Sequence, residues 1–303
     1  METKLKFRPI HFNWVAIHPQ PIGVIHFIGG AFFGTFPTIF DRYIIRRLFQ
    51  QGYTIAALPF RFTFRHWSVA IALVRDQAEL RQAIAVEAKR LGYEDKIYEE
   101  EPIAQNPNHF WLAHSVGCKY IALLELLTEL EDRDIQEFLG ECVGSEQFAD
   151  IEHSLREVDL QDISLKNQPS ILLAPVIAGI ESAIPVAAVA ELVKKLGLDV
   201  QPNVKETRCL INKSRLFGLT AAIAFSQDKI ASNPEIDEEG EPKGTVQWLQ
   251  KHVPSIKFSQ LPNRQHLAPL GFRFGDSQLA DEVIKLLKME TKQLESILIQ
   301  PES

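Results

Sequence analysis

Ser115 is the residue of this sequence best placed to act as a nucleophile. It follows the apolar run HFWLA and His114, and small residues, Ala113 and Gly117, stand two positions before and after it. An amphipathic helical pattern begins directly after the serine. A serine on a tight turn between a strand and a helix holds its hydroxyl out at the edge of a sheet, as a nucleophile requires.

Ala113 is the weak point of this pattern. The usual form has glycine at both flanking positions, because a side chain there would collide with neighbouring backbone in the strained turn. Alanine is the smallest replacement, so it weakens the match without removing it. Short motifs of this kind also arise by chance. The prediction therefore depends on the other groups that a serine nucleophile needs.

A carboxylate and a histidine follow two later apolar runs. Asp228 comes just after the run TAAIAFS, and His266 lies in a turn-rich loop after the run IKFSQL. The active sites of open parallel sheets lie beyond the carboxyl ends of the strands, so both side chains are expected near Ser115. His266 would then serve as the general base and Asp228 would orient it. The alternative for Asp228 is a turn or helix-capping role, the commonest use of such a residue.

Other histidines fit the role of base less well. His26 lies inside an apolar run and is predicted to be a packed core residue. His114 is next to the nucleophile, but the turn is expected to point its side chain away from the site. His266 is therefore the preferred candidate.

A glycine-rich segment, GGAFFG, follows the early apolar run VIHFI. Small residues let backbone N–H groups approach the substrate oxygen on which negative charge develops. The predicted oxyanion donors are the N–H groups of Gly30 or Ala31, together with that of Val116. The alternatives are a simple turn or the phosphate loop of a nucleotide-binding domain. Neither G-x-G-x-x-G nor Gly-Lys-Ser/Thr is present, which argues against the nucleotide alternative.

Five side chains are candidates for the substrate pocket. Phe32 and Phe33 follow the predicted oxyanion loop, and Arg61, Arg65 and His66 lie in the loop after the run YTIAALPF. Aromatic groups favour a substrate with an apolar acyl or alcohol part, although apolar residues line most pockets. The two arginines could meet a carboxylate or phosphate of the substrate, or could be solvated surface residues.

Apolar runs of strand length alternate with helical patterns along the chain. Continuous runs separated by helices favour a mostly parallel sheet with helices on both faces. Strands are predicted at residues 15–19, 23–30, 53–60, 109–115, 170–176, 220–226 and 256–261, the first two forming a pair. Helices are predicted at residues 38–51, 68–91, 116–130 and 278–295.

Two segments interrupt this alternation within a single expected domain, residues 1–303. Residues 131–168 are charged and helix-like, and are predicted to form a solvated insertion outside the sheet. Residues 177–214 carry the apolar stretch IAGIESAIPVAAVAELV and are a candidate lid over the site.

Taken together, the GGA loop and the AHSVG, QDKI and QHLAP segments resemble the α/β-hydrolase superfamily. The resemblance covers residues 15–287, and the order Ser115, Asp228, His266 is the one expected there. The segments HFIGGAFFGTFP and GYTIAALPF are similar to a poorly characterised branch of the superfamily seen in cyanobacteria and plastids. The resemblance implies an α/β-hydrolase fold with Ser115 as nucleophile, His266 as base and Asp228 as orienting acid.

The function predicted from these residues is hydrolysis of an ester or thioester, with a lipid-like substrate favoured, by a Ser-His-Asp acyl-enzyme mechanism. No metal or organic cofactor is required. The alternative is a non-catalytic binding or assembly protein of the same fold, which Ala113 and the insertions keep open.

Composition narrows the class of protein. The 303 residues are 46% hydrophobic, enough for one large α/β core. The net charge is −7 and the basic residues form no tail or stripe, so nucleic acid is not an expected partner.

The three cysteines, Cys118, Cys142 and Cys209, show neither zinc spacing nor a disulfide framework, so a reducing, cytoplasmic location is expected. No signal peptide or transmembrane segment is predicted. Peripheral membrane contact and the oligomeric state stay open.

Overall fold

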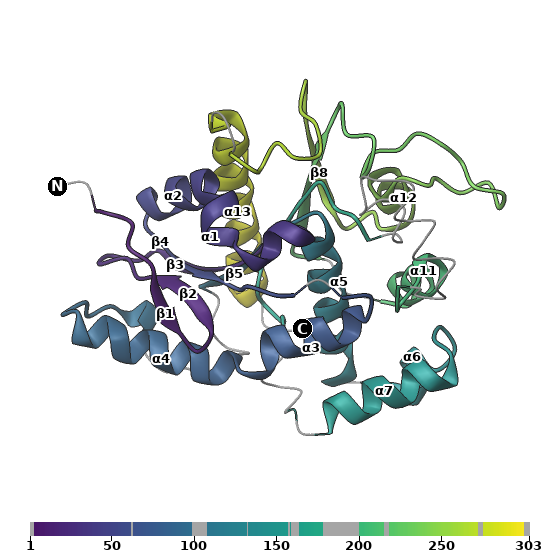
Figure 1. Cartoon of the computed structure of the whole chain (residues 1–303), viewed down its shortest axis with the longest axis horizontal. Helices are drawn as coiled ribbons and strands as arrows, with labels where there is room; N and C mark the ends of the chain where they lie inside the picture. The colour runs from purple at the N-terminus through teal and green to yellow at the C-terminus, as the bar shows by residue number, and fades with distance from the viewer. Residues whose placement is uncertain are drawn as a thin grey trace.

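The computed structural model describes residues 3–61, 63–98, 108–131, 133–156, 158, 164–177, 200–214, 218–271 and 275–299. Within these residues, eight strands form one sheet in the order β1-β2-β4-β3-β5-β6-β7-β8, with helices on both of its faces (Figure 1). No helix in the described ranges has both the length and the apolar character needed to cross a bilayer.

Strands β3 to β8 are parallel, and β1 and β2 add an antiparallel edge. Every residue of β3 to β7 is buried, as continuous apolar runs indicate for strands covered on both faces. The bounds are β1 (Arg8–Ile10), β2 (Asn13–Ala16), β3 (Gly23–Ile28), β4 (Tyr53–Ala57), β5 (His109–His114), β6 (Ser170–Leu173), β7 (Thr220–Phe225) and β8 (Lys257–Leu261).

The prediction that the first two expected strands pair with each other is wrong. Strand β4 lies between β2 and β3, parallel to β3 and antiparallel to β2. The chain leaves β3, forms helices and returns beside it, so the strand that is nearest in sequence is displaced by a later one. Closeness in sequence favours pairing but does not determine it. The edge strand β1 was not predicted either.

The helices are α1 (Pro37–Phe40), α2 (Arg42–Gln50), α3 (His66–Arg75), α4 (Gln77–Arg90), α5 (Val116–Thr128), α6 (Ile135–Leu139), α7 (Ser145–Leu155), α11 (Val204–Lys213), α12 (Thr245–His252) and α13 (Ser277–Ile299). The 3-10 turns are η1 (Phe32–Thr35), η2 (Lys96–Tyr98) and η4 (Glu129–Glu131). Helices α2 and α13 cover one face of the sheet, and α3, α4 and α5 cover the other (Figure 1).

The long helix predicted over residues 68–91 is two helices that meet at Asp76. The break lets α3 pack against α5 while α4 contacts β1. Periodicity alone did not reveal it, because both helices keep an apolar face toward the same core.

The charged segment 131–168 contains α6 and α7, which pack on the core through buried side chains. Phe138 and Ile151 are buried, and Trp67 Nε1 of α3 donates to Gln147 Oε1 of α7 at 2.9 Å. Of the candidate lid, residues 178–199 lie outside the described residues. Its last part forms α11, which begins with a capping box made by Asn203 and Glu206.

The prediction that the cysteines form no disulfide is wrong. Cys142, between α6 and α7, is bonded to Cys209 of α11, and Cys118 is free and buried. The two bonded residues are 67 positions apart, and packing of α6 against α11 brings them together. The spacing of the cysteines along the chain does not predict this contact. A disulfide does not fit the reducing compartment that the cysteine pattern favours.

The start of α5 lies against the end of β3. A Cβ atom on Gly117 would lie 2.6 Å from the carbonyl oxygen of Gly29 and 2.7 Å from that of Ile28. Both neighbours are backbone atoms, which cannot swing aside as a side chain can. Glycine at this position therefore allows the close contact between α5 and β3.

We expect Gly117→Ala to lower the free energy of unfolding by about 1–3 kcal/mol, the usual cost of forcing a methyl group into a packed site. Thermal unfolding would measure the loss. Gly218→Ala is the matched control, because a Cβ there meets no atom within 4 Å. Equal melting temperatures for the two variants would contradict this account of Gly117.

Glu125 is a carboxyl group buried in the core on α5. Its Oε1 accepts hydrogen bonds from Ser170 Oγ at 3.3 Å and Thr220 Oγ1 at 3.5 Å. Burial raises the pKa of this carboxyl from 4.5 to about 8, and the charge of Glu129 adds to the rise. The folded state therefore holds a proton that the unfolded chain releases, so stability falls as the pH rises from 4.5 toward 8.

We expect Glu125→Gln to flatten this dependence, because glutamine keeps the hydrogen-bonding shape without ionising. The melting temperature of the wild type should fall more steeply than that of the variant from about pH 5 to about pH 8. Glu152→Gln, at an exposed position of α7, controls for the loss of one carboxylate. Parallel curves for wild type and Glu125→Gln would rule out this role.

Candidate active site

Ser115 sits on a sharp turn between β5 and α5 with φ 57° and ψ −120°. This backbone conformation is unfavourable for a residue with a side chain, and such strain gathers at functional sites. Hydrogen bonds hold it in place: Ser115 N–H donates to Leu173 O at 2.9 Å, and Ser115 O accepts from Val176 N–H at 3.2 Å. The end of β6 and the residues after it therefore fix the turn that presents the serine.

The turn forms although alanine occupies position 113. Ala113 is fully buried and belongs to the hydrophobic core cluster on the α5 side of the sheet. At the other flanking position, a Cβ on Gly117 would meet the backbone carbonyl groups of Ile28 and Gly29. The chain thus keeps glycine at the flanking position where a methyl group has no room.

The structure brings Ser115, His266 and Asp228 together in a hydrogen-bonded line. Ser115 Oγ lies 2.8 Å from His266 Nε2, and His266 Nδ1 lies 2.8 Å from Asp228 Oδ2. All three side chains are buried. Because a carboxylate only accepts, Nδ1 carries the proton and donates to Asp228, which leaves Nε2 as the acceptor for the serine hydroxyl.

Asp228 combines the two roles that its position suggests. Its Oδ1 accepts from the N–H groups of Ile230 at 2.8 Å and Ala231 at 3.0 Å, which is the turn-forming role. Its Oδ2 faces His266. The turn therefore fixes the carboxylate with one oxygen aimed at the histidine.

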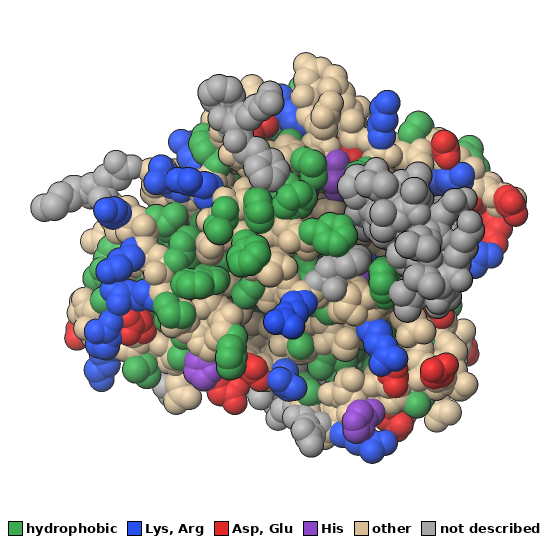
Figure 2. Space-filling view, viewed as in Figure 1, with side chains coloured by type: hydrophobic (Ala, Val, Ile, Leu, Met, Phe, Trp, Pro, Cys, Tyr) green, Lys and Arg blue, Asp and Glu red, His purple; other side chains and the backbone are tan. Residues whose placement is uncertain are grey.

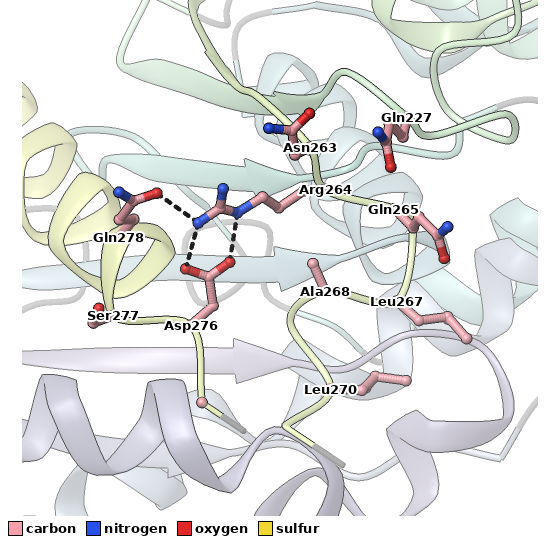
Figure 3. Close-up of a pocket in the computed structure, with 11 residues that line it drawn as sticks. Gln227, Asn263, Arg264, Gln265, Leu267, Ala268, Leu270, Asp276, Ser277 and Gln278 are labelled. Carbon is pink, nitrogen blue, oxygen red and sulfur yellow. Dashed lines mark hydrogen bonds and ion pairs between the residues drawn. The ribbon is translucent and has the colours of Figure 1, made fainter. Parts of the chain in front are cut away.

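The loop that carries His266 is tied down on both sides. Arg264 O accepts from Gln227 N–H at 2.9 Å, which joins this loop to the one that carries Asp228. The Arg264 guanidinium forms a two-point ion pair with Asp276, before α13, and also donates to Gln278 (Figure 3). These residues line the pocket drawn in Figure 3, which lies beside the loop.

His114 is a residue whose role the sequence reasoning missed. Its side chain was predicted to point away from the site, but its Nε2 lies 2.9 Å from the carbonyl oxygen of His266, and the two rings are 5.4 Å apart. A carbonyl only accepts, so His114 Nε2–H donates and holds the backbone of His266. Burial, followed by the charge of His266, lowers the pKa of His114 to about 3, so the ring is neutral.

The reason for this placement is the alternation of side chains along β5. His114 faces the opposite side from Ala113, where the loop after β3 passes. A Cβ atom on Gly30 would lie 3.1 Å from His114 Nδ1 and 3.3 Å from Ser115 Cβ. The histidine before the serine therefore fills the space between two loops of the site.

The predicted oxyanion residues Gly30, Ala31 and Val116 lie close to Ser115 in the chain or in space. Gly30 packs against Ser115, and Ala31 follows it at the start of η1. Val116 begins α5, where the helix dipole is positive. Among the described residues, no hydrogen bond is donated by the N–H groups of Gly30, Ala31 or Val116.

The predicted pocket residues have different surroundings. Phe32 is half exposed and the ring of Phe33 packs on Phe40, 5.0 Å away. Arg61 is exposed, and Arg65 forms an ion pair of 3.7 Å with Asp150 of α7.

His66 is buried with its ring edge-on to Tyr120, and burial, followed by the charge of Lys119, lowers its pKa well below its usual range. Lys119 is a second residue that the sequence reasoning missed. Its side chain is fully buried one turn after Ser115, and Nζ donates to Pro202 O at 2.5 Å. The signal was a lysine in the otherwise apolar stretch GCKYIALLELL. Residues 64–66 also pair with Gln201, so the chain that leads into α11 is fastened beside the site.

No group of three or more His, Cys, Asp and Glu side chains in the described residues is arranged to hold a metal ion.

Comparison with known proteins bears on the fold. Residues 6–136 match a family described as "Protein of unknown function (DUF1350)". No curated protein sequence matches the chain. One similar structure is that of esterase B from Lactobacillus rhamnosis, inhibited by a C4-C4 SN3 tributyrin phosphonate. The two sequences are 15% identical. The match covers 93% of this chain and 80% of the esterase chain, with a TM-score of 0.51.

A candidate carboxylesterase from Lactobacillus plantarum is 10% identical, with 95% of this chain and 98% of that chain covered and a TM-score of 0.50. At such identities the likeness concerns the fold. The strand order and these neighbours agree: the chain has the α/β-hydrolase fold.

Proposed function

We propose that this protein is a serine hydrolase that cleaves a carboxylic ester or thioester through an acyl-enzyme intermediate. One observation carries the proposal: Asp228, His266 and Ser115 form an unbroken hydrogen-bonded line at the carboxyl ends of the strands. Three residues from three separate loops meet in the order and geometry that nucleophilic catalysis by serine needs.

The proposed reaction begins when Ser115 Oγ attacks the substrate carbonyl carbon and His266 Nε2 takes the hydroxyl proton. Asp228 stabilises the imidazolium that forms and keeps the proton on Nδ1. The N–H group of Gly30 or Ala31, together with that of Val116, would donate to the oxygen that becomes negative. His266 then gives its proton to the departing alcohol or thiol, which leaves the acyl group on Ser115.

The second half repeats these steps with water. His266 removes a proton from a water molecule as that water attacks the acyl carbon, and the proton passes to Ser115 Oγ when the acid leaves. Each proton that His266 accepts is returned in the same half-reaction. In this scheme the same serine, histidine and aspartate serve both steps, and water from the solvent is the second nucleophile.

The decisive test is labelling with a fluorophosphonate followed by intact mass measurement. The wild type should gain one adduct and Ser115→Ala none, because the probe needs an activated serine. Ser154→Ala, on α7, is the matched control and should label like the wild type. Asp228→Asn should slow labelling by about 10³–10⁴-fold, since the histidine loses its orienting partner.

A wild-type protein that resists both a bulky and a small phosphonate would sink the proposal and favour a non-catalytic binding protein. If the wild type does label, a panel of esters with graded acyl length, run beside Ser115→Ala, would give the class of substrate. Hydrolysis that persists in Ser115→Ala would also contradict the proposed role of Ser115 as nucleophile.

His114 gives a second prediction, as a residue that positions His266. His114→Phe keeps a ring but removes the donor to His266 O, so the base loop loses its anchor. We expect kcat to fall about 10–100-fold with little change in KM, the usual effect of a small misplacement of a reacting group. His114→Gln, which retains an N–H donor, should recover part of the loss.

The pH dependence separates positioning from proton transfer. Because burial lowers the pKa of His114 to about 3, replacing it should remove no ionisation from the rate profile at neutral pH. An ionisation that disappears in His114→Phe, or a kcat equal to that of the wild type, would contradict the positioning role.

A further inference from the structure

Large apolar side chains are exposed on segments that adjoin the Ser115 site in sequence. Phe32 of η1 is 53% exposed, Phe36 between η1 and α1 is 54% exposed, and Ile39 of α1 is 60% exposed. Leu267, directly after His266, is 48% exposed. Gly271 N–H donates to Phe40 O at 3.2 Å, which holds the loop after β8 beside α1. We call these four exposed side chains the apolar rim. Exposed apolar groups gathered in one place mark an interaction surface.

A second exposed group lies at the same edge of the sheet, on the turn between β1 and β2 and at the start of β2. Phe12 is 95% exposed and Trp14 is 41% exposed. Strand β2 runs antiparallel to β4, and Trp14 pairs with Ala57, the last residue of β4. The turn therefore lies at the carboxyl edge of the parallel strands, where Ser115 also lies.

The turn holds Phe12 in the open at a conformational cost. His11 and Phe12 both have positive φ, 43° and 59°, which is unfavourable for residues with large side chains. A residue that is 95% exposed makes little contact with its own protein. Folding of this chain therefore does not explain the aromatic side chain at this tip.

The first part of the chain, which carries most of these apolar groups, is basic in sequence. Four of its arginines are ion-paired, Arg8 with Glu87, Arg47 with Asp281, Arg65 with Asp150 and Arg75 with Asp76, whereas Arg42, Arg46 and Arg61 form no ion pair with the described residues. Residues 1–75 contain nine Lys and Arg but two Asp and Glu, and the remaining residues contain the other 23 basic and 37 acidic ones. The net charge of −7 is thus +7 in the first part and −14 in the rest. One of the two acidic residues, Asp41, is fully buried, and burial raises its pKa well above the usual range.

Exposed arginines of this basic part lie next to the apolar rim. Arg42 and Arg46 are on the outer side of α2, which follows α1. Arg61 follows Phe60, whose N–H donates to Gly34 O of η1 at 3.3 Å. Figure 2 shows hydrophobic side chains over the region of η1, α1 and the β1–β2 turn, with Lys and Arg among and around them and most Asp and Glu toward the margins.

We propose that this edge of the molecule docks on the surface of a bilayer that contains anionic lipid. Apolar groups from two separate segments, with arginines between and beside them, match a surface of anionic headgroups over acyl chains. Nucleic acid would match the arginines but leave Phe12 and the apolar rim unused. Docking itself does not depend on the proposed function. If the protein docks in this way, its substrate is an ester held in that bilayer. This consequence rests on the proposed function.

Co-sedimentation of the full chain with vesicles tests the docking. Binding to phosphatidylcholine vesicles with added phosphatidylglycerol should be about tenfold stronger than to phosphatidylcholine alone, and should weaken as salt is added. The Ser115→Ala protein should bind equally well. A protein that docks but does not hydrolyse esters would thus retain this inference and lose the proposed function.

Substitutions locate the surface. Phe12→Ser and Ile39→Ser should each weaken binding to the anionic vesicles several-fold, and Arg46→Gln should weaken it and reduce the salt dependence. Val86→Ser and Ile236→Ser are matched controls, since these residues are 61% and 65% exposed elsewhere on the molecule. Phe12→Ser should leave the hydrolysis of a short soluble ester unchanged.

Three outcomes would overturn the inference. The first is no binding to either type of vesicle. The second is binding that Phe12→Ser, Ile39→Ser and Arg46→Gln leave unchanged. The third is self-association in light scattering that Phe12→Ser and Ile39→Ser abolish, which would identify the surface as a contact between copies of this chain.

Discussion

The backbone conformation of Ser115 is the constraint on which the rest of the site depends. A residue with a side chain adopts φ 57° only where its neighbours hold it there. Hydrogen bonds from the end of β6 do so on one side, and the contact of Gly117 with the end of β3 does so on the other. The hydroxyl direction, the position of the Val116 N–H and the contact with Gly30 all follow from this one turn.

The histidine and the carboxylate are fixed by a different means, through polar contacts between loops. Asp228 is held by the backbone N–H groups of its turn. The loop that carries His266 is held by Arg264, which pairs with Asp276 just before α13, and by His114, which donates to the backbone of His266. The contacts of Asp228 and His114 also satisfy polar side chains that burial would otherwise leave without a partner. A neutral His114 suits this task, because a second positive charge beside His266 would oppose the imidazolium formed during the proposed reaction.

The parts of the fold and site that the sequence predicts are those set by local pattern. Buried parallel strands appear as apolar runs, and active-site residues of this architecture follow strand ends, so Ser115, Asp228 and His266 could be chosen before the structure was known. What the sequence could not supply depends on contacts between distant segments. The place of β4 between β2 and β3, the bond between Cys142 and Cys209, and the contact of His114 with His266 are of this kind. The surroundings of Arg65 and His66 likewise depend on α7 and α5, which lie far away in sequence.

The disulfide changes the connectivity of the molecule as well as its packing. Cys142 and Cys209 close residues 143–208 into a covalent ring, and α7, β6 and the start of α11 belong to that ring. A single peptide bond cut anywhere inside it leaves both pieces joined. The strand that supports the Ser115 turn is thus attached to the rest of the chain by two covalent routes, and one break does not release it.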